Sequence, residues 1–239
     1  CPPSQYIETY QSFLDACRNT SARLFFPTYH KQTFLYPFQR VHKLIHLIRN
    51  PLHNFVARFH LDRKTRASRA SKTNKKEQLW LDSHPSNETG FQIWCHDLDE
   101  EYKNEEYKSF DAEFLQILQS TPCHGEVYRF VQWHNMVFQM ADERKKILQQ
   151  AQNDNNNNNP IPPPFDVMVL HYEDYEKDFS KTMHRLLDFL EQPAQAEPRE
   201  FSPGHEYNTY YSKKDKQHIQ TMIQRMASPT TWDALKHYF

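Results

Sequence analysis

Arg49 is the residue of this sequence best placed to bind a phosphate group. It directly follows an apolar run, residues 44–48, whose length and composition predict a short buried strand. Asn50 and Pro51 come next, a pair typical of a helix start, because asparagine caps helices and proline is tolerated at the first helical position. An arginine at the carboxyl end of a strand, beside a helix N-terminus, suits a bound phosphate. The alternative interpretation is an ordinary strand-to-helix turn with a solvated arginine.

A second group of chemically capable residues, Tyr172, Glu173 and Asp174, closes a later apolar segment. Residues 167–175 predict a second buried strand, of the parallel type, that ends in these two carboxylates. Paired carboxylates at a strand end can act as a general acid and a general base. The interpretation favoured here is simpler: the two acids cap local backbone groups and hold the turn that follows the strand.

Helices must hold these strand ends in place, and the spacing of apolar residues predicts several. In each predicted helix the apolar side chains recur three or four positions apart, so that they share one face. The predicted helices cover residues 4–17, 51–61, 110–118 and 126–150, and others begin at Ser180 and, through a capping box with Asp215, at Ser212. Together with a short strand at 24–26, they indicate a single α/β domain over residues 1–239.

Two stretches of unusual composition are predicted to be surface insertions. Residues 63–76 hold seven basic residues and no acidic one, which is typical of a solvated loop and also of an electrostatic lip that attracts an anionic substrate. Residues 151–164 are rich in asparagine and proline, a low-complexity composition that predicts a surface loop.

The overall composition argues against several classes of function. The formal net charge is −1, so nothing indicates a nucleic acid polymer as a partner. Only three glycines are present, so the sequence contains neither a Walker loop nor a dinucleotide-binding loop, which disfavours a P-loop kinase. No run of 18 or more apolar residues occurs, so we expect any membrane anchor to lie outside these residues.

The four cysteines indicate disulfides rather than a metal site. Their spacing matches neither a zinc-binding CxxC pattern nor a redox motif, and the preferred pairing is Cys1–Cys17 and Cys95–Cys123. His96, next to Cys95, is interpreted as a surface histidine rather than a metal ligand.

Three segments, taken in order, resemble one enzyme family, the sulfotransferases that use 3′-phosphoadenosine 5′-phosphosulfate (PAPS). The segments are the strand, Arg-Asn-Pro and helix of residues 44–60, then Val-Leu-His-Tyr-Glu-Asp-Tyr at 169–175 with Leu-Leu-Asp-Phe-Leu-Glu at 186–191, and finally Phe-x-x-Gly…Tyr-Tyr-Ser at 201–212. The resemblance is to carbohydrate or Golgi-like members and to algal-type domains. It implies an α/β fold like that of the P-loop NTPases, with three layers (α/β/α) around a central, mainly parallel sheet that is incomplete at the N-terminus.

The resemblance also assigns roles to single residues. Arg49 matches the family's arginine on the 3′-phosphate of the nucleotide, and Tyr172 matches a position that commonly contacts the adenine. Ala57 stands where the family usually has a serine that binds the same phosphate, so we expect weaker cofactor binding unless Arg58 or a loop group compensates. The basic residues that often precede the glycine matching Gly204 are missing here.

No residue of this sequence is assigned a catalytic role. The family's phosphosulfate-binding loop and its catalytic histidine normally precede the first segment, and residues 1–42 match neither. We therefore expect that the sequence begins after those elements and that these residues alone are inactive.

The resemblance implies transfer of a sulfuryl group from PAPS to a hydroxyl or amine of an acceptor, which we expect to be a carbohydrate, without a metal cofactor. Sequons at Asn19 and Asn87, with the even number of cysteines, favour the Golgi lumen or another part of the secretory pathway. A membrane anchor would then lie in a segment outside this chain. The alternative is a non-catalytic relative that binds an anionic glycan or a protein partner through residues 63–76. The oligomeric state stays open.

Overall fold

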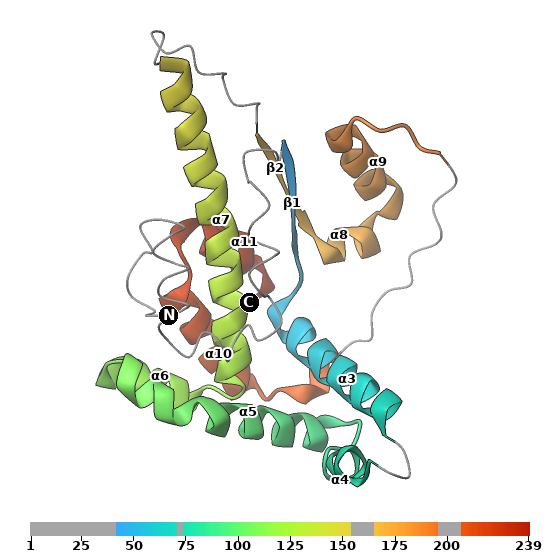
Figure 1. Ribbon diagram of the computed structural model, residues 1–239, viewed down its shortest axis with the longest axis vertical. Coiled ribbons are helices and arrows are strands. Elements are labelled where there is room, and N and C mark those ends of the chain that lie inside the picture. Colours follow the sequence, from blue (N-terminus) through green and yellow to red (C-terminus); the bar gives the residue numbers. More distant parts are fainter. Residues whose placement is uncertain (1–41, 71–73, 154–164, 196–206) are drawn as a thin grey trace. The chain divides into compact units, whose positions relative to one another are not determined.

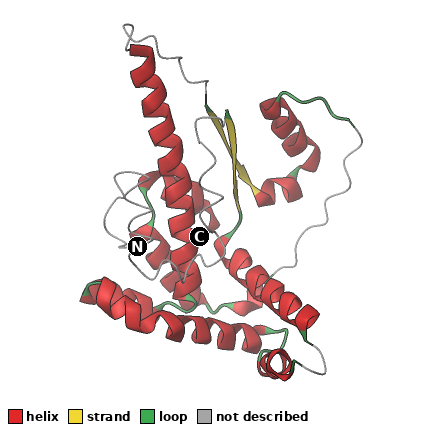
Figure 2. Cartoon of the chain, viewed as in Figure 1, coloured by secondary structure: helices red, strands yellow, loops and turns green. Residues whose placement is uncertain are grey.

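The computed structural model describes residues 42–70, 74–153, 165–195 and 207–239 (Figure 1). These residues form two compact units, and the long helix α7 (His124–Asn153) contributes to both. The sheet unit comprises the described residues within 42–50 and 136–195, and the helical unit comprises those within 51–135 and 207–239. Helices dominate the described chain, which contains one pair of strands (Figure 2). The prediction of a single domain over residues 1–239 stays a prediction.

The sheet unit is built on two parallel strands, β1 (Lys43–Ile48) and β2 (Asp166–His171). Lys43 lies opposite Asp166 and Ile48 lies opposite His171, so the two strands end at the same edge. Both predicted strands and their parallel direction are therefore confirmed. A parallel pair cannot be joined by a tight turn, and the chain between the strands runs through the helical unit and α7.

The prediction that residues 44–48 form a buried strand holds for one face of β1 only. His46 and Ile48 are 3% and 0% exposed, whereas Ile45 and Leu47 are 37% and 51% exposed. This alternation is typical of a strand that packs against neighbouring elements on one face only. An apolar run of this length does not by itself distinguish the two cases.

Two short helices follow β2 in the sheet unit, α8 (Tyr172–Lys177) and α9 (Phe179–Leu190). The predicted strand over 167–175 is therefore too long, because the chain turns helical at Tyr172 and carries two acids in the first turn of α8, where the helix dipole favours them. The predicted cap at Ser180 is also wrong. Asp178 caps α9 instead, and its carboxylate accepts a hydrogen bond from the Lys181 N–H at 2.9 Å.

The helical unit packs its helices around aromatic and aliphatic side chains. Its elements are α3 (Pro51–Arg69), α4 (Lys75–Ser83), α5 (Glu88–Ser109), α6 (Ala112–Ser120), the first part of α7, η2 (Asn208–Tyr210), α10 (Lys213–Met226), α11 (Pro229–Leu235) and η3 (Lys236–Tyr238). Phe55 and Phe59 of α3 are fully buried, as are Leu118, Ile219 and Met222. The predicted start of α3 at Pro51 and the predicted capping box before α10 are confirmed.

The basic stretch at 63–76 is not a loop over most of its described length. Residues up to 69 continue α3, and α4 begins at residue 75. The Nε of Arg66 lies 3.1 Å from Asp62 Oδ1 one turn earlier, and its Nη1 lies 3.2 Å from Glu77 Oε2 of α4. The guanidinium also lies over the Trp80 ring at 4.2 Å. These contacts favour the helical structure, because the partly buried side chain of Arg66 joins α3 to α4.

The predicted disulfide between Cys95 and Cys123 is confirmed, and it joins α5 to the residue before α7. His96 is exposed, as predicted. The predictions for 4–17, 24–26, Cys1–Cys17 and Asn19, and those for residues 154–164 and Gly204, lie outside the described residues. Within the described ranges, no helix is long and apolar enough to cross a bilayer.

Candidate functional site

Arg49 and Tyr172 lie side by side at the carboxyl edge of the two strands. The register pairs Ile48 with His171, the last residues of β1 and β2, so the next residue of each strand leaves the sheet at the same edge. The guanidinium carbon of Arg49 lies over the face of the Tyr172 ring, 4.6 Å from its centre. The structure thus brings together the two residues that the sequence assigned to nucleotide binding.

The Arg49 guanidinium keeps hydrogen-bonding capacity for a ligand. Its Nε is buried and donates no hydrogen bond to any residue that the structure describes. A buried donor without an acceptor costs about 1–3 kcal/mol, which a ligand oxygen would recover. The planar fork of arginine donors matches the oxygens of a phosphate, and the stack on Tyr172 fixes the plane of that fork. The residues present therefore fit a nucleotide phosphate.

The two carboxylates at the start of α8 have structural partners. Glu173 Oε1 accepts a hydrogen bond from the backbone N–H of Asn50 at 2.8 Å, which ties the turn after β1 to α8. Asp174 Oδ2 lies 3.7 Å from Nη1 of Arg185 in α9. Glu173 thus holds backbone, as predicted, but this backbone belongs to the turn after β1 and is not local to Glu173. Because the two carboxylates engage separate partners, they are not arranged as a general acid and base acting on one substrate.

His46 of β1 is a buried base in the same unit as Arg49. Its ring meets the Phe138 ring of α7 edge to face, with 4.6 Å between the ring centres. Burial, together with the charge of His171, lowers the pKa of His46 from 6.5 to about 4. The imidazole is therefore neutral in the folded protein at a pH where a free histidine carries a proton.

We expect His46 to make the protein less stable between pH 6.5 and pH 4. In this range the unfolded chain binds a proton that the folded chain does not, so the free energy of unfolding falls as the pH falls, by up to roughly 3 kcal/mol for a shift of this size. Urea unfolding followed by circular dichroism at the two ends of this range, compared between the wild type and His46→Gln, separates this contribution from that of Asp99, whose raised pKa acts in the opposite direction. In His46→Gln the loss should shrink, while the exposed His42→Gln should keep it. A His46→Gln variant with the wild-type pH dependence would contradict the assignment.

Ala57 and Arg58 lie in the helical unit, on α3. Ala57 has no hydroxyl group. The Nε of Arg58 lies 2.6 Å from Oε2 of Glu126 in α7, a carboxylate that is 4% exposed. Burial raises the pKa of Glu126, and the ion pair with Arg58 opposes that rise. The Nε of Arg58 is thus paired within the helical unit, and the expectation that Arg58 compensates for the missing serine stays a prediction.

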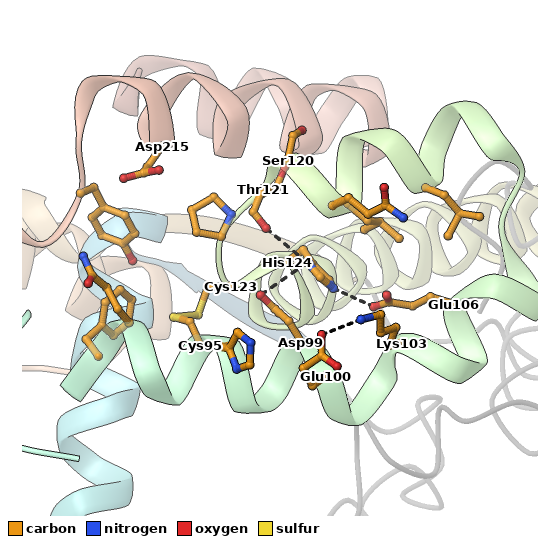
Figure 3. A pocket seen from close by; sticks show the side chains of 18 of the residues that line it. Cys95, Asp99, Glu100, Lys103, Glu106, Ser120, Thr121, Cys123, His124 and Asp215 are labelled. Carbon is orange, nitrogen blue, oxygen red and sulfur yellow. Dashed lines mark hydrogen bonds and ion pairs between the residues drawn. A yellow bond between two sulfur atoms is a disulfide. The ribbon is translucent and has the colours of Figure 1, made fainter. Parts of the chain in front are cut away.

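The helical unit contains a cluster of ionisable side chains that was not predicted from the sequence, formed by Asp99 and Glu106 of α5 and His124 of α7 (Figure 3). The sequence contains a spacing pattern that indicates this cluster. Cys95, Asp99 and Glu106 are four and seven positions apart, which places them on one face of a helix. The predicted disulfide joins Cys95 to Cys123, the neighbour of His124. The spacing and the disulfide together would have predicted this cluster.

Comparison with protein families shows which family the chain belongs to. The family model described as a sulfotransferase domain matches residues 4–227. The chain belongs to the sulfotransferase family. The match spans all three segments on which the resemblance rested, including both residues of the candidate nucleotide site. Comparisons of this sulfotransferase with curated proteins and with solved structures found no match.

Proposed function

We propose that this sulfotransferase transfers the sulfuryl group of PAPS to a hydroxyl or amine of an acceptor, and that the acceptor is a carbohydrate. Family membership supports sulfuryl transfer in general. The observation that carries the choice of nucleotide is the buried Nε of Arg49, which has no acceptor among the described residues and belongs to a guanidinium stacked on Tyr172. A group of this kind suits the phosphate that distinguishes PAPS from an ordinary adenosine 5′-nucleotide.

In this proposal the described residues bind and orient the co-substrate. Arg49 donates hydrogen bonds to the 3′-phosphate, and these are strong because both partners are charged. Tyr172 holds the guanidinium in plane, and the hydrogen bond from Asn50 to Glu173 holds the backbone beside it. Fixing the nucleotide in this way lowers the barrier to in-line transfer, because one reactant no longer needs to be positioned. The phosphosulfate loop and the catalytic base are assigned to no described residue.

We also propose that β1 and β2 belong to a larger parallel sheet in a three-layer α/β/α domain, and that the protein works in the Golgi lumen or elsewhere in the secretory pathway. The exposed Ile45 and Leu47 support the first statement, because parallel strands are usually covered on both faces. The disulfide between Cys95 and Cys123 supports the second, because disulfides persist in oxidising compartments.

The test compares the binding of 3′-phosphoadenosine 5′-phosphate and 5′-AMP by isothermal titration calorimetry. We expect the wild type to bind the nucleotide with the 3′-phosphate more tightly, and Arg49→Ala to lose about 2 kcal/mol, roughly a 30-fold weaker affinity, because it removes a charge-assisted contact. Arg49→Lys should recover only part of the affinity, since an ammonium group lacks the planar fork.

A matched control is Arg185→Ala, which removes an arginine of the same unit that is half exposed and lies near Asp174. It should bind 3′-phosphoadenosine 5′-phosphate as the wild type does. Equal affinity of the wild type for the two nucleotides would contradict the role of the 3′-phosphate. Equal losses in Arg49→Ala and Arg185→Ala would show that general positive charge, rather than the stacked Arg49, holds the nucleotide.

A further inference from the structure

The helical unit contains a cavity of about 570 Å³ between α5, the end of α6, the start of α7 and the region around the start of α10 (Figure 3). Part of its wall is apolar and aromatic, with Phe91, Leu118 and Tyr211 all nearly or fully buried. The disulfide between Cys95 and Cys123 also lines it and ties the helices on two sides. A concave, partly aromatic cavity of this size is the usual form of a small-molecule site.

Three ionisable side chains converge on the same cavity. His124 lies between two carboxylates: its Nδ1 is 3.4 Å from Asp99 Oδ2, and its Nε2 is 3.0 Å from Glu106 Oε1. The side chains of His124, Asp99 and Glu106 are only 11%, 16% and 10% exposed. Asp99 also accepts a hydrogen bond from the Gly125 N–H at 3.0 Å, which fixes its carboxylate against the start of α7.

The charges of this cluster do not balance. Two carboxylates face one imidazole, so a negative charge remains even when His124 is protonated. The rest of the lining does not remove this surplus. Lys103 pairs with Glu100 at 2.8 Å and is also influenced by the charge of Glu106. The four carboxylates of the lining, Asp99, Glu100, Glu106 and Asp215, outnumber its one lysine and two histidines. An uncompensated charge is costly where water is partly excluded, and a bound cation would offset that cost.

The pKa shifts of Asp99 and His124 agree with a surplus of negative charge in the cluster. Burial raises the pKa of Asp99 to about 6, against the opposing influence of His124. Burial alone would lower the pKa of His124, but its close contact with Glu106 and the charges of both carboxylates raise it overall. Above the pKa of Asp99 that carboxylate is ionised and contributes its negative charge to the cluster.

We propose that this cavity binds a small organic cation, an amine carried on an aromatic body, with its ammonium group against Asp99 and Glu106. The aromatic wall contacts the body of such a ligand, and the carboxylates accept hydrogen bonds from its ammonium group. A bare metal ion fits less well, because no group of three metal-binding side chains is arranged around a common point within the described ranges. The proposal goes beyond the sulfuryl transfer proposed above, since neither Arg49 nor the nucleotide takes part in it.

The experiment compares tryptamine with tryptophol, its neutral alcohol analogue, by isothermal titration calorimetry on the full chain at about pH 7.5, well above the pKa of Asp99. We expect tryptamine to bind at least about tenfold more tightly than tryptophol. Glu106→Gln should weaken tryptamine at least about tenfold and leave tryptophol unchanged. The control is Glu101→Gln, which removes an exposed carboxylate of the same helix that does not line the cavity.

A second variant keeps the test decisive if Glu106→Gln fails to fold. Gln92→Trp places a large side chain at an exposed rim position and leaves the buried cluster intact, so both ligands should be lost without a change in melting temperature. Equal affinity for the two ligands, no tryptamine binding, or wild-type affinity in Gln92→Trp would each overturn the proposal. Affinity for 3′-phosphoadenosine 5′-phosphate, measured in parallel, should not change in these variants, so the two proposals can fail separately.

Discussion

Replacing Gly90 with alanine should lower the free energy of unfolding by at least about 3 kcal/mol, the upper range for forcing extra atoms into a packed site. Gly90 is buried in the first turn of α5, and a Cβ there would lie 1.8 Å from the carbonyl oxygen of Pro85. That oxygen belongs to the backbone, so no rotamer change can relieve the clash. The same oxygen also accepts a hydrogen bond from the Asn87 N–H at 2.8 Å, and the Asn87 side chain accepts one from the Gly90 N–H. Moving Pro85 away from the new Cβ would therefore disrupt the start of α5.

Urea unfolding followed by tryptophan fluorescence measures this effect in the right part of the molecule, because all four tryptophans belong to the helical unit. Gly125→Ala is the matched control. A Cβ at Gly125 would lie 3.1 Å from a ring carbon of Tyr102, a side chain that can shift, and alanine is favoured over glycine within a helix by about 1 kcal/mol. We expect this variant to stay within about 1 kcal/mol of the wild type. Similar losses in both variants would contradict the role given to Pro85.

Removal of the Cys95–Cys123 disulfide should lower the free energy of unfolding by about 3–4 kcal/mol. The bond closes a loop of 28 positions, and the chain-entropy estimate for such a loop is about 3.6 kcal/mol. Cys95→Ala with Cys123→Ala tests it by the same fluorescence-monitored unfolding, since alanine leaves no buried polar group at these two sites, which are 4% and 0% exposed.

A reductant provides the control for the disulfide experiment. It should destabilise the wild type by about as much as the two substitutions do, and it should have a much smaller effect on the doubly substituted protein. A wild type that unfolds identically with and without reductant would show that the bond adds nothing to stability. The comparison also isolates this bond from Cys1 and Cys17, which stay the same in both proteins.

The sequence predicted the parts of the fold whose signals are local. Asn50 and Pro51 gave the start of α3 correctly, and Ser212 with Asp215 gave the capping box of α10. The helices α4 and α5 were missed because their charged residues obscure any apolar periodicity and their stability comes from contacts distant in sequence. Arg66 shows this well, since its partners Glu77 and Trp80 lie in another helix. Propensity alone cannot account for such contacts.

The sequence could predict the two residues of the candidate site that lie at strand ends. Arg49 and Tyr172 each follow an apolar run, and parallel pairing brings such positions to one edge of a sheet. The stacking of the guanidinium on the ring and the hydrogen bond from Asn50 to Glu173 could not be predicted, because they depend on where α8 begins. The sequence favoured a strand there, and the true boundary at Tyr172 decides which way these side chains point.

The parallel pairing of β1 and β2 has a consequence for how the chain is made. Arg49 and Tyr172 are separated by about 120 positions, and at roughly 5–20 residues per second the ribosome needs about 6–25 s to reach the second after the first. During that interval β1 lacks the strand that satisfies its backbone groups, and an unpaired apolar edge is a template for aggregation. The edge formed by Arg49 and Tyr172 therefore cannot assemble until residue 172 has been made, and β1 is open to aggregation during that interval.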